Sequence, residues 1–142
     1  MLLFLFQLGS GLQFLRILSW RPSNFFATLQ SVLGAYLIFF ILAHMNSVFF
    51  YARRFARIPT DWNFATGAPT GLLRDAWNIR LLPHYALGVF LVLTHLVLGA
   101  RLVALAHGGS VARVDAWTRV GIALAALVTV AIMLGMADVH LA

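Results

Sequence analysis

The chain has 142 residues, of which 62% are hydrophobic and 10% are charged. Soluble domains usually carry about 25% charged residues, so this composition excludes an ordinary soluble domain and predicts a protein of the lipid bilayer. The formal net charge is +6, and all the positive side chains are arginines. In so apolar a chain this charge indicates anchoring at the membrane surface and contact with membrane lipid, and we expect no nucleic-acid partner.

The chain contains no cysteine. This excludes disulfides, iron–sulfur clusters, cysteine-ligated zinc and covalently attached c-type haem. Any cofactor of this chain must therefore be held by histidine, methionine or oxygen ligands.

The hydrophobic stretches predict an all-α, polytopic transmembrane helical bundle of three to four spans, forming a single domain over residues 1–142. A span needs about 20 largely apolar residues. Three stretches meet this requirement, at residues 29–56, 83–106 and 117–139. Residues 2–19 either form a fourth span or lie in the interface as an amphipathic helix, because polar residues interrupt them. A signal peptide is a third alternative for this segment, although its positively charged start is missing.

Residues 57–82 form the only long polar connection, which we expect to lie at one membrane surface. The spacing of its apolar residues predicts a short amphipathic helix, and Asp61 or Thr70 could cap such a helix. With four spans, five arginines fall on each side of the membrane. The positive-inside rule is therefore tied and does not orient the chain.

Two histidines, His44 and His95, lie deep in different predicted spans, where ionisable side chains are rare and usually functional. His44 is about 20 Å from Arg57, and His95 is about 18 Å from Pro83, at 1.5 Å per helical residue. Their levels then match, so both could ligate one metal; a helix that ends at Tyr51 would open an offset of about 7 Å. A histidine hydrogen-bonded to a neighbouring helix is the alternative reading of each.

Small residues accompany His95 along one stripe of its helix, where His84, Gly88, Leu91, His95 and Gly99 follow at helical spacing. Gly88 and Gly99 would leave a slot beside the histidine that a flat macrocycle could enter. The alternative is that these glycines only permit close helix packing.

Further candidates lie near the ends of the spans. His84 and His140 could form a second metal-ligand pair for a second macrocycle, although the nearby chain terminus also explains the polarity of His140. A quinone could bind near Trp62, Arg80, His84 and Tyr85. An interfacial aromatic belt is the alternative for Trp62 and Tyr85.

Three segments resemble the cytochrome b membrane-anchor subunits of the succinate dehydrogenase and fumarate reductase (succinate:quinone oxidoreductase) superfamily. They are LGAYLIFFILAHMNSV at residues 33–48, THLVLGARLVALAHG at 94–108 and RVGIALAALVTVAIMLG at 119–135. The resemblance implies that His44 and His95 are axial ligands of one haem b. It also implies a quinone and partner subunits that carry flavin and iron–sulfur clusters.

We therefore expect a haem b-binding membrane-anchor or electron-transfer subunit of a quinone-linked respiratory oxidoreductase, integral to the bacterial inner (cytoplasmic) membrane. Two other functions fit the same residues. One is a bacteriochlorophyll-binding or photosynthetic accessory protein, for which His44 beside Ala43 would serve as a single axial ligand. The other is a cofactor-free structural subunit of a membrane complex, in which the histidines only pack.

Overall fold

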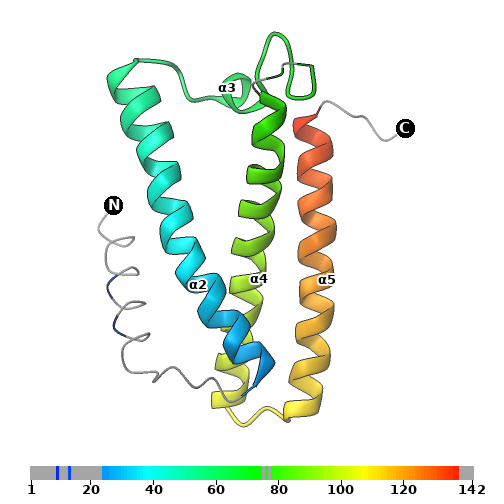
Figure 1. Ribbon diagram of the computed structural model, residues 1–142. Coiled ribbons are helices and arrows are strands. Elements are labelled where there is room, and N and C mark those ends of the chain that lie inside the picture. Colours follow the sequence, from blue (N-terminus) through cyan, green and yellow to red (C-terminus); the bar gives the residue numbers. More distant parts are fainter. Residues whose placement is uncertain (1–8, 10–12, 14–23, 75, 77, 138–142) are drawn as a thin grey trace.

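The computed structural model describes Gly9, Gln13 and residues 24–74, 76 and 78–137. Within this part the chain is helical and contains no strand (Figure 1). Its elements are α2 (Phe25–His44), the π-helix η1 (Met45–Phe55), the short α3 (Trp62–Thr66), the 3-10 helix η2 (Asn78–Leu81), α4 (Leu82–Ala106) and α5 (Val111–Met136).

The predicted all-α membrane bundle is confirmed. Three helical segments of the described residues are long and apolar enough to cross a membrane, namely Phe25–Phe55, Asn78–Ala106 and Val111–Met136. The span or interfacial helix expected at residues 2–19 lies outside the described residues, as does His140.

Two helices begin earlier than the hydropathy pattern predicts, because polar side chains cap them. The Asn24 side chain accepts a hydrogen bond of 3.0 Å from the Ala27 amide, so α2 begins at Phe25 and not at residue 29. Ser110 accepts from the Arg113 amide at 3.4 Å and starts α5 at Val111, not at residue 117. The first turns of α5 carry charge, which hides them from a search for apolar residues.

The winding of the first span changes directly after His44. There α2 continues into the π-helix η1, and the Ser47 hydroxyl donates to the carbonyls of Ala43 at 3.0 Å and His44 at 3.2 Å. The π-helix ends at Phe55, and two residues later Arg57 takes a φ of 55°, in the left-handed region. Turns of π-helix occur frequently at functional sites, and here one starts beside a candidate ligand.

Helix α4 lies between α2 and α5 and packs against both (Figure 1). Leu33 and Leu37 of α2 meet Leu91 and Leu98 of α4 in the main apolar core. On the other side, α5 approaches closely at Gly121, where an added Cβ would lie 2.8 Å from Cγ1 of Val97. Small residues at such contacts let membrane helices approach each other.

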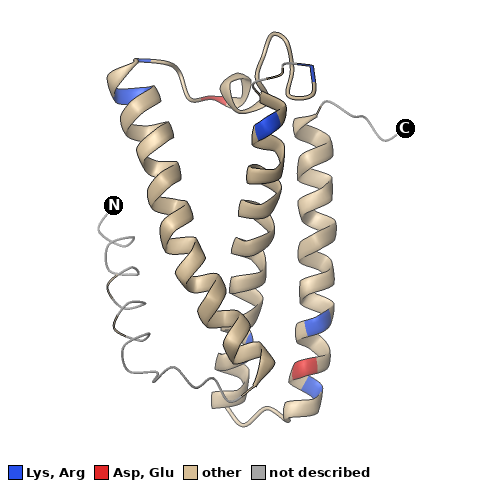
Figure 2. Cartoon of the chain, viewed as in Figure 1, with Lys and Arg blue, Asp and Glu red and all other residues tan. Residues whose placement is uncertain are grey.

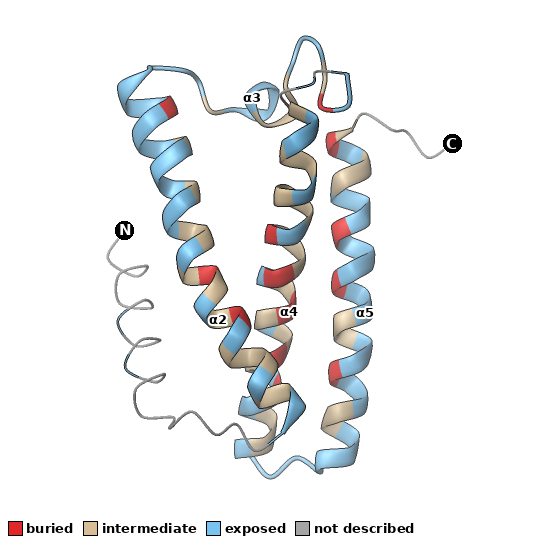
Figure 3. Cartoon of the chain, viewed as in Figure 1, coloured by how far each residue is buried: buried red, intermediate tan, exposed pale blue. Residues whose placement is uncertain are grey.

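The inward and outward faces of the helices differ sharply (Figure 3). Large apolar side chains such as Phe39, Leu96 and Leu127 are more than 60% exposed on the surface of the chain. Arginines and aspartates of the described residues lie toward the two ends of the helices (Figure 2). This distribution suits helices surrounded by lipid with their ends at the two membrane surfaces.

One arginine, Arg101, contacts all three long helices near their ends at the turn between α4 and α5. Nε of Arg101 on α4 donates to Oδ1 of Asp115 on α5 at 2.8 Å. The guanidinium carbon of the same arginine lies 4.7 Å from the centre of the Phe26 ring on α2, within range of a cation–π attraction. Arg101 thus links α4 to α5 through an ion pair and to α2 through a cation–π contact.

This topology predicts the sides from which engineered cysteines can be labelled. The chain has no native cysteine, so each introduced thiol reports one position. Asp61→Cys and Arg74→Cys should react with a membrane-impermeant maleimide from the same side, because both lie in the connection between α2 and α4. Ser110→Cys should react from the opposite side, and Leu98→Cys, whose native side chain is 1% exposed, should not react. Labelling of positions 61 and 74 from opposite sides would contradict the three-span arrangement.

Candidate functional site

The candidate residues lie along the contact between α2 and α4, and three glycines set how these helices meet. Gly34 faces His95, Gly88 faces Phe40, and Gly99 faces Gln30. Residues 30, 34 and 40 of α2 therefore lie opposite residues 99, 95 and 88 of α4, so the numbers rise along one helix as they fall along the other. The helices therefore run antiparallel in one register.

At the first contact each helix places a polar side chain on a glycine of the other. A Cβ added to Gly34 would lie 3.2 Å from Cε1 of His95, and one added to Gly99 would lie 4.0 Å from Nε2 of Gln30. Because Gln30 and Gly34 are four residues apart, as are His95 and Gly99, each pair lies on one face of its helix. We call these contacts the glycine notches.

Three polar atoms near these notches are buried without a hydrogen-bond partner among the described residues. They are Oε1 of Gln30, Oγ1 of Thr94 and Nδ1 of His95. Leaving such a group unpaired costs about 1–3 kcal/mol. The contact can therefore accept a polar partner, such as a water molecule or a ligand atom.

The second contact lies farther along α2, where the Phe40 side chain fills the space above Gly88. The tip of its ring occupies the position that a Cβ on Gly88 would need. The ring centre of Phe40 lies 4.5 Å from that of His84 and 6.1 Å from that of His44. Two histidines from different spans thus contact one flat aromatic side chain above a glycine.

The structure does not bring His44 and His95 together. His95 packs on Gly34, which lies ten residues before His44, or about 15 Å along the helix axis. Counting from the helix ends assumes parallel axes, whereas α2 is tilted and diverges from α4 toward the long connection (Figure 1). Instead, His44 and His84 share a neighbour, because the ring centre of Phe40 lies 6.1 Å from that of His44 and 4.5 Å from that of His84.

The two glycines that the sequence predicts beside His95, Gly88 and Gly99, have different neighbours. Gly88 is covered by Phe40, whereas Gly99 is in van der Waals range of Gln30. Both therefore lie in the contact between α2 and α4, as the spacing along α4 predicts.

The quinone candidates are all near the long connection between α2 and α4. Trp62 begins α3, Arg80 belongs to η2, and His84 and Tyr85 lie in the first turn of α4. The rings of His84 and Tyr85 are 6.2 Å apart, and Trp62 is 62% exposed. These residues share one end of the bundle with His44.

Sequence reasoning missed Gly34, Gln30 and Phe40 as partners of the histidines. A usable signal was present for the first two: Gln30 precedes Gly34 by four residues, just as His95 precedes Gly99. Such matched spacing on two spans is typical of helices that pack through small residues. Phe40 lies in an apolar run and carries no such signal.

The described residues contain no group of three or more histidine, aspartate or glutamate side chains that could hold a metal ion. The arrangement instead offers two imidazoles from different helices. Comparison with family models, curated proteins and solved structures finds no match for the chain.

The notch at Gly34 can be tested by adding a side chain. Gly34→Leu should lower the thermal unfolding temperature measured by circular dichroism in detergent, because the larger residue displaces His95; overpacking typically costs about 1–3 kcal/mol. Gly135→Leu is the matched control, since an added Cβ there meets nothing within 4 Å. Equal unfolding temperatures for the two variants would show that Gly34 is not part of a tight contact.

Proposed function

We propose that this chain is a haem b-binding membrane-anchor or electron-transfer subunit of a quinone-linked oxidoreductase complex. One observation carries the proposal: His44 and His84, from two membrane-spanning helices, contact the same flat side chain above Gly88. Ionisable residues within membrane spans are usually functional. Imidazole is also a common axial ligand of haem iron.

On this proposal Phe40 turns out of the space above Gly88 and a haem takes its place, since Gly88 has no side chain to block it. His44 and His84 would hold the haem, each as the neutral imidazole that ligation requires. The span changes from α-helix to π-helix directly after His44.

The pair implied by the family resemblance, His44 with His95, is less favoured by this geometry. The two residues lie at contacts about 15 Å apart along α2. His95 also has a packing role, because its ring rests on Gly34. This role supports the competing proposal of a cofactor-free structural subunit, and the experiment below separates the two.

A bound haem b supplies one-electron transfer at its iron. On this proposal the chain holds that group near the end of the bundle that also carries Trp62, Arg80 and Tyr85, where a quinone could bind. The chain has no cysteine for an iron–sulfur cluster, so the electrons would come from partner subunits that carry flavin and iron–sulfur clusters. A bacterial inner membrane is the location that this function implies.

Substitution of single histidines tests the proposal. His44→Gln and His84→Gln should each abolish the low-spin haem absorption of the purified complex, because either change removes one axial ligand. His95→Gln should retain at least about half of the wild-type haem, since it leaves both proposed ligands in place. Absorption spectra of the reduced and oxidised protein, normalised to polypeptide, give the measurement.

His107→Gln serves as the control for losing a histidine outside the site. Its Nδ1 lies 2.9 Å from the carbonyl oxygen of Val103 in its own helix, so the haem signal should be unchanged. Loss of the low-spin signal in His44→Gln and His95→Gln, with retention in His84→Gln, would transfer the site to the pair that the resemblance implies. A wild-type protein without haem would support the cofactor-free subunit.

A further inference from the structure

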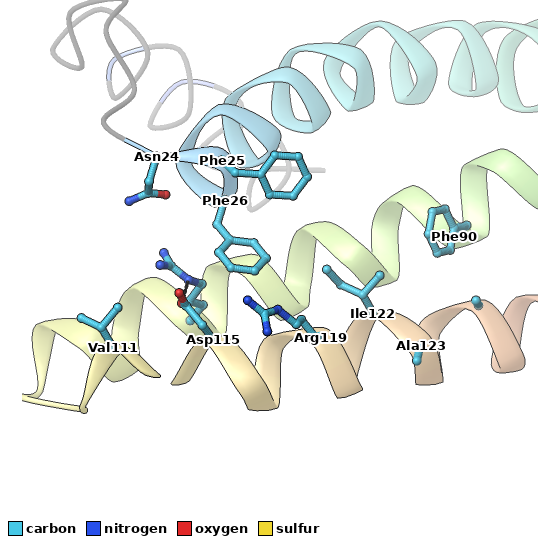
Figure 4. Close-up of a pocket in the computed structure, with 11 residues that line it drawn as sticks. Asn24, Phe25, Phe26, Phe90, Val111, Asp115, Arg119, Ile122 and Ala123 are labelled. Atoms are coloured by element: carbon cyan, nitrogen blue, oxygen red, sulfur yellow. Dashed lines mark hydrogen bonds and ion pairs between the residues drawn. The ribbon is translucent and has the colours of Figure 1, made fainter. Parts of the chain in front are cut away.

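A pocket of about 680 Å³ lies at the other end of the bundle, where α2, α4 and α5 meet (Figure 4). Most of its wall is apolar. Phe25 and Phe26 contribute from α2, Phe90 from α4, and Ile122 and Ala123 from α5. All three long helices therefore build this pocket, and small residues of α5 leave room along one side.

The pocket also carries a net positive charge. Arg101 and Asp115 both line it, but they neutralise each other through their ion pair of 2.8 Å. Arg119 lies one helical turn beyond Asp115, lines the same pocket (Figure 4) and makes no ion pair with another described residue. One uncompensated arginine thus borders an apolar pocket.

The depth of Arg119 indicates what could compensate it. Helix α5 has 26 residues, about 39 Å, which exceeds the hydrocarbon thickness of about 30 Å. If α5 is centred in the bilayer, Arg119, about 12 Å from the start of the helix, lies roughly 7 Å inside the hydrocarbon boundary. A charge there is costly unless it reaches the headgroup level or pairs with an anion. The side chain of Arg119 can extend toward the nearer membrane surface, where the available anions are lipid phosphates.

We propose that this pocket binds one anionic phospholipid, with the headgroup phosphate on Arg119 and an acyl chain against Phe90, Ile122 and Ala123. The net charge of the pocket favours an anionic lipid over a zwitterionic one, and its apolar walls favour a lipid over free phosphate. Basic pockets between membrane helices are known to bind lipid headgroups. The site is distinct from the proposed haem contact, because His84 and Arg101 are separated by about 25 Å of α4.

Lipid titration of the full chain tests this site. Phosphatidylglycerol and phosphatidylcholine are added separately to delipidated protein in detergent, and native mass spectrometry counts bound lipid. The wild type should bind phosphatidylglycerol about fivefold more tightly than phosphatidylcholine, as one arginine near the headgroup level provides. Arg119→Gln should remove this preference, and Arg119→Lys should retain most of it because the charge remains.

Three further variants separate binding in the pocket from the effect of general surface charge and from any effect of substituting α5. Arg113→Gln removes one charge from the same helix outside the pocket lining and should keep the fivefold preference. Ala123→Phe should weaken binding of both lipids by filling the pocket, whereas Ala116→Phe, which does not line it, should not.

Three outcomes would overturn the proposal. The first is an equal loss of preference in Arg119→Gln and Arg113→Gln. The second is lipid binding unchanged by Ala123→Phe. The third is complete competition by inorganic phosphate at the lipid concentration, which would indicate an anion site without a role for the acyl chain. Circular dichroism of each variant verifies that the helices remain folded, and none of these results depends on haem content.

Discussion

Reciprocal contact between two polar side chains and two glycines holds α2 against α4. Gln30 reaches the notch of Gly99, and His95 rests on Gly34. Within a bilayer the hydrophobic effect does not drive helices together, so they associate where small residues allow close packing. Once this contact forms, the antiparallel register is set, and it determines which residues can meet farther along both helices. It brings His84 against the Phe40 ring that also contacts His44, and at the opposite end it brings Phe26 against Arg101.

The two ends of the bundle consequently have different chemistry. Toward the long connection, histidines and aromatic rings lie around a space that Phe40 fills. This arrangement suits a flat, apolar group that carries a metal for the histidines to ligate. Toward the turn between α4 and α5, an ion pair and an arginine that pairs with no other described residue border an apolar pocket. This arrangement suits an amphiphile with an anionic head. Both proposals depend on the central position of α4, which contributes to both ends.

Hydropathy was sufficient to predict the helical class and the three described spans, because lipid requires long apolar helices whatever their packing. It missed the starts of α2 and α5, where Asn24 and Ser110 extend the helices beyond their apolar cores. The site was harder to predict. The glycines beside His95 indicated a helix contact. The level at which α2 meets α4 depends on the tilt of α2, however, and this tilt cannot be obtained by counting residues from the end of a helix. Phe40 could not be recognised, since one phenylalanine in an apolar run looks like any other.

Cross-linking with a short bifunctional thiol reagent measures the register between α2 and α4 directly, and the chain has no native cysteine to interfere. In a double variant with cysteine at Gln30 and Gly99 the reagent should join the two thiols within one chain, because Nε2 of Gln30 lies 4.0 Å from the position of a Cβ on Gly99. In a double variant with cysteine at His44 and His95 it should not, since about 15 Å of helix axis separates their levels. Efficient cross-linking of positions 44 and 95, without cross-linking of 30 and 99, would contradict the register and restore the histidine pair that the register separates.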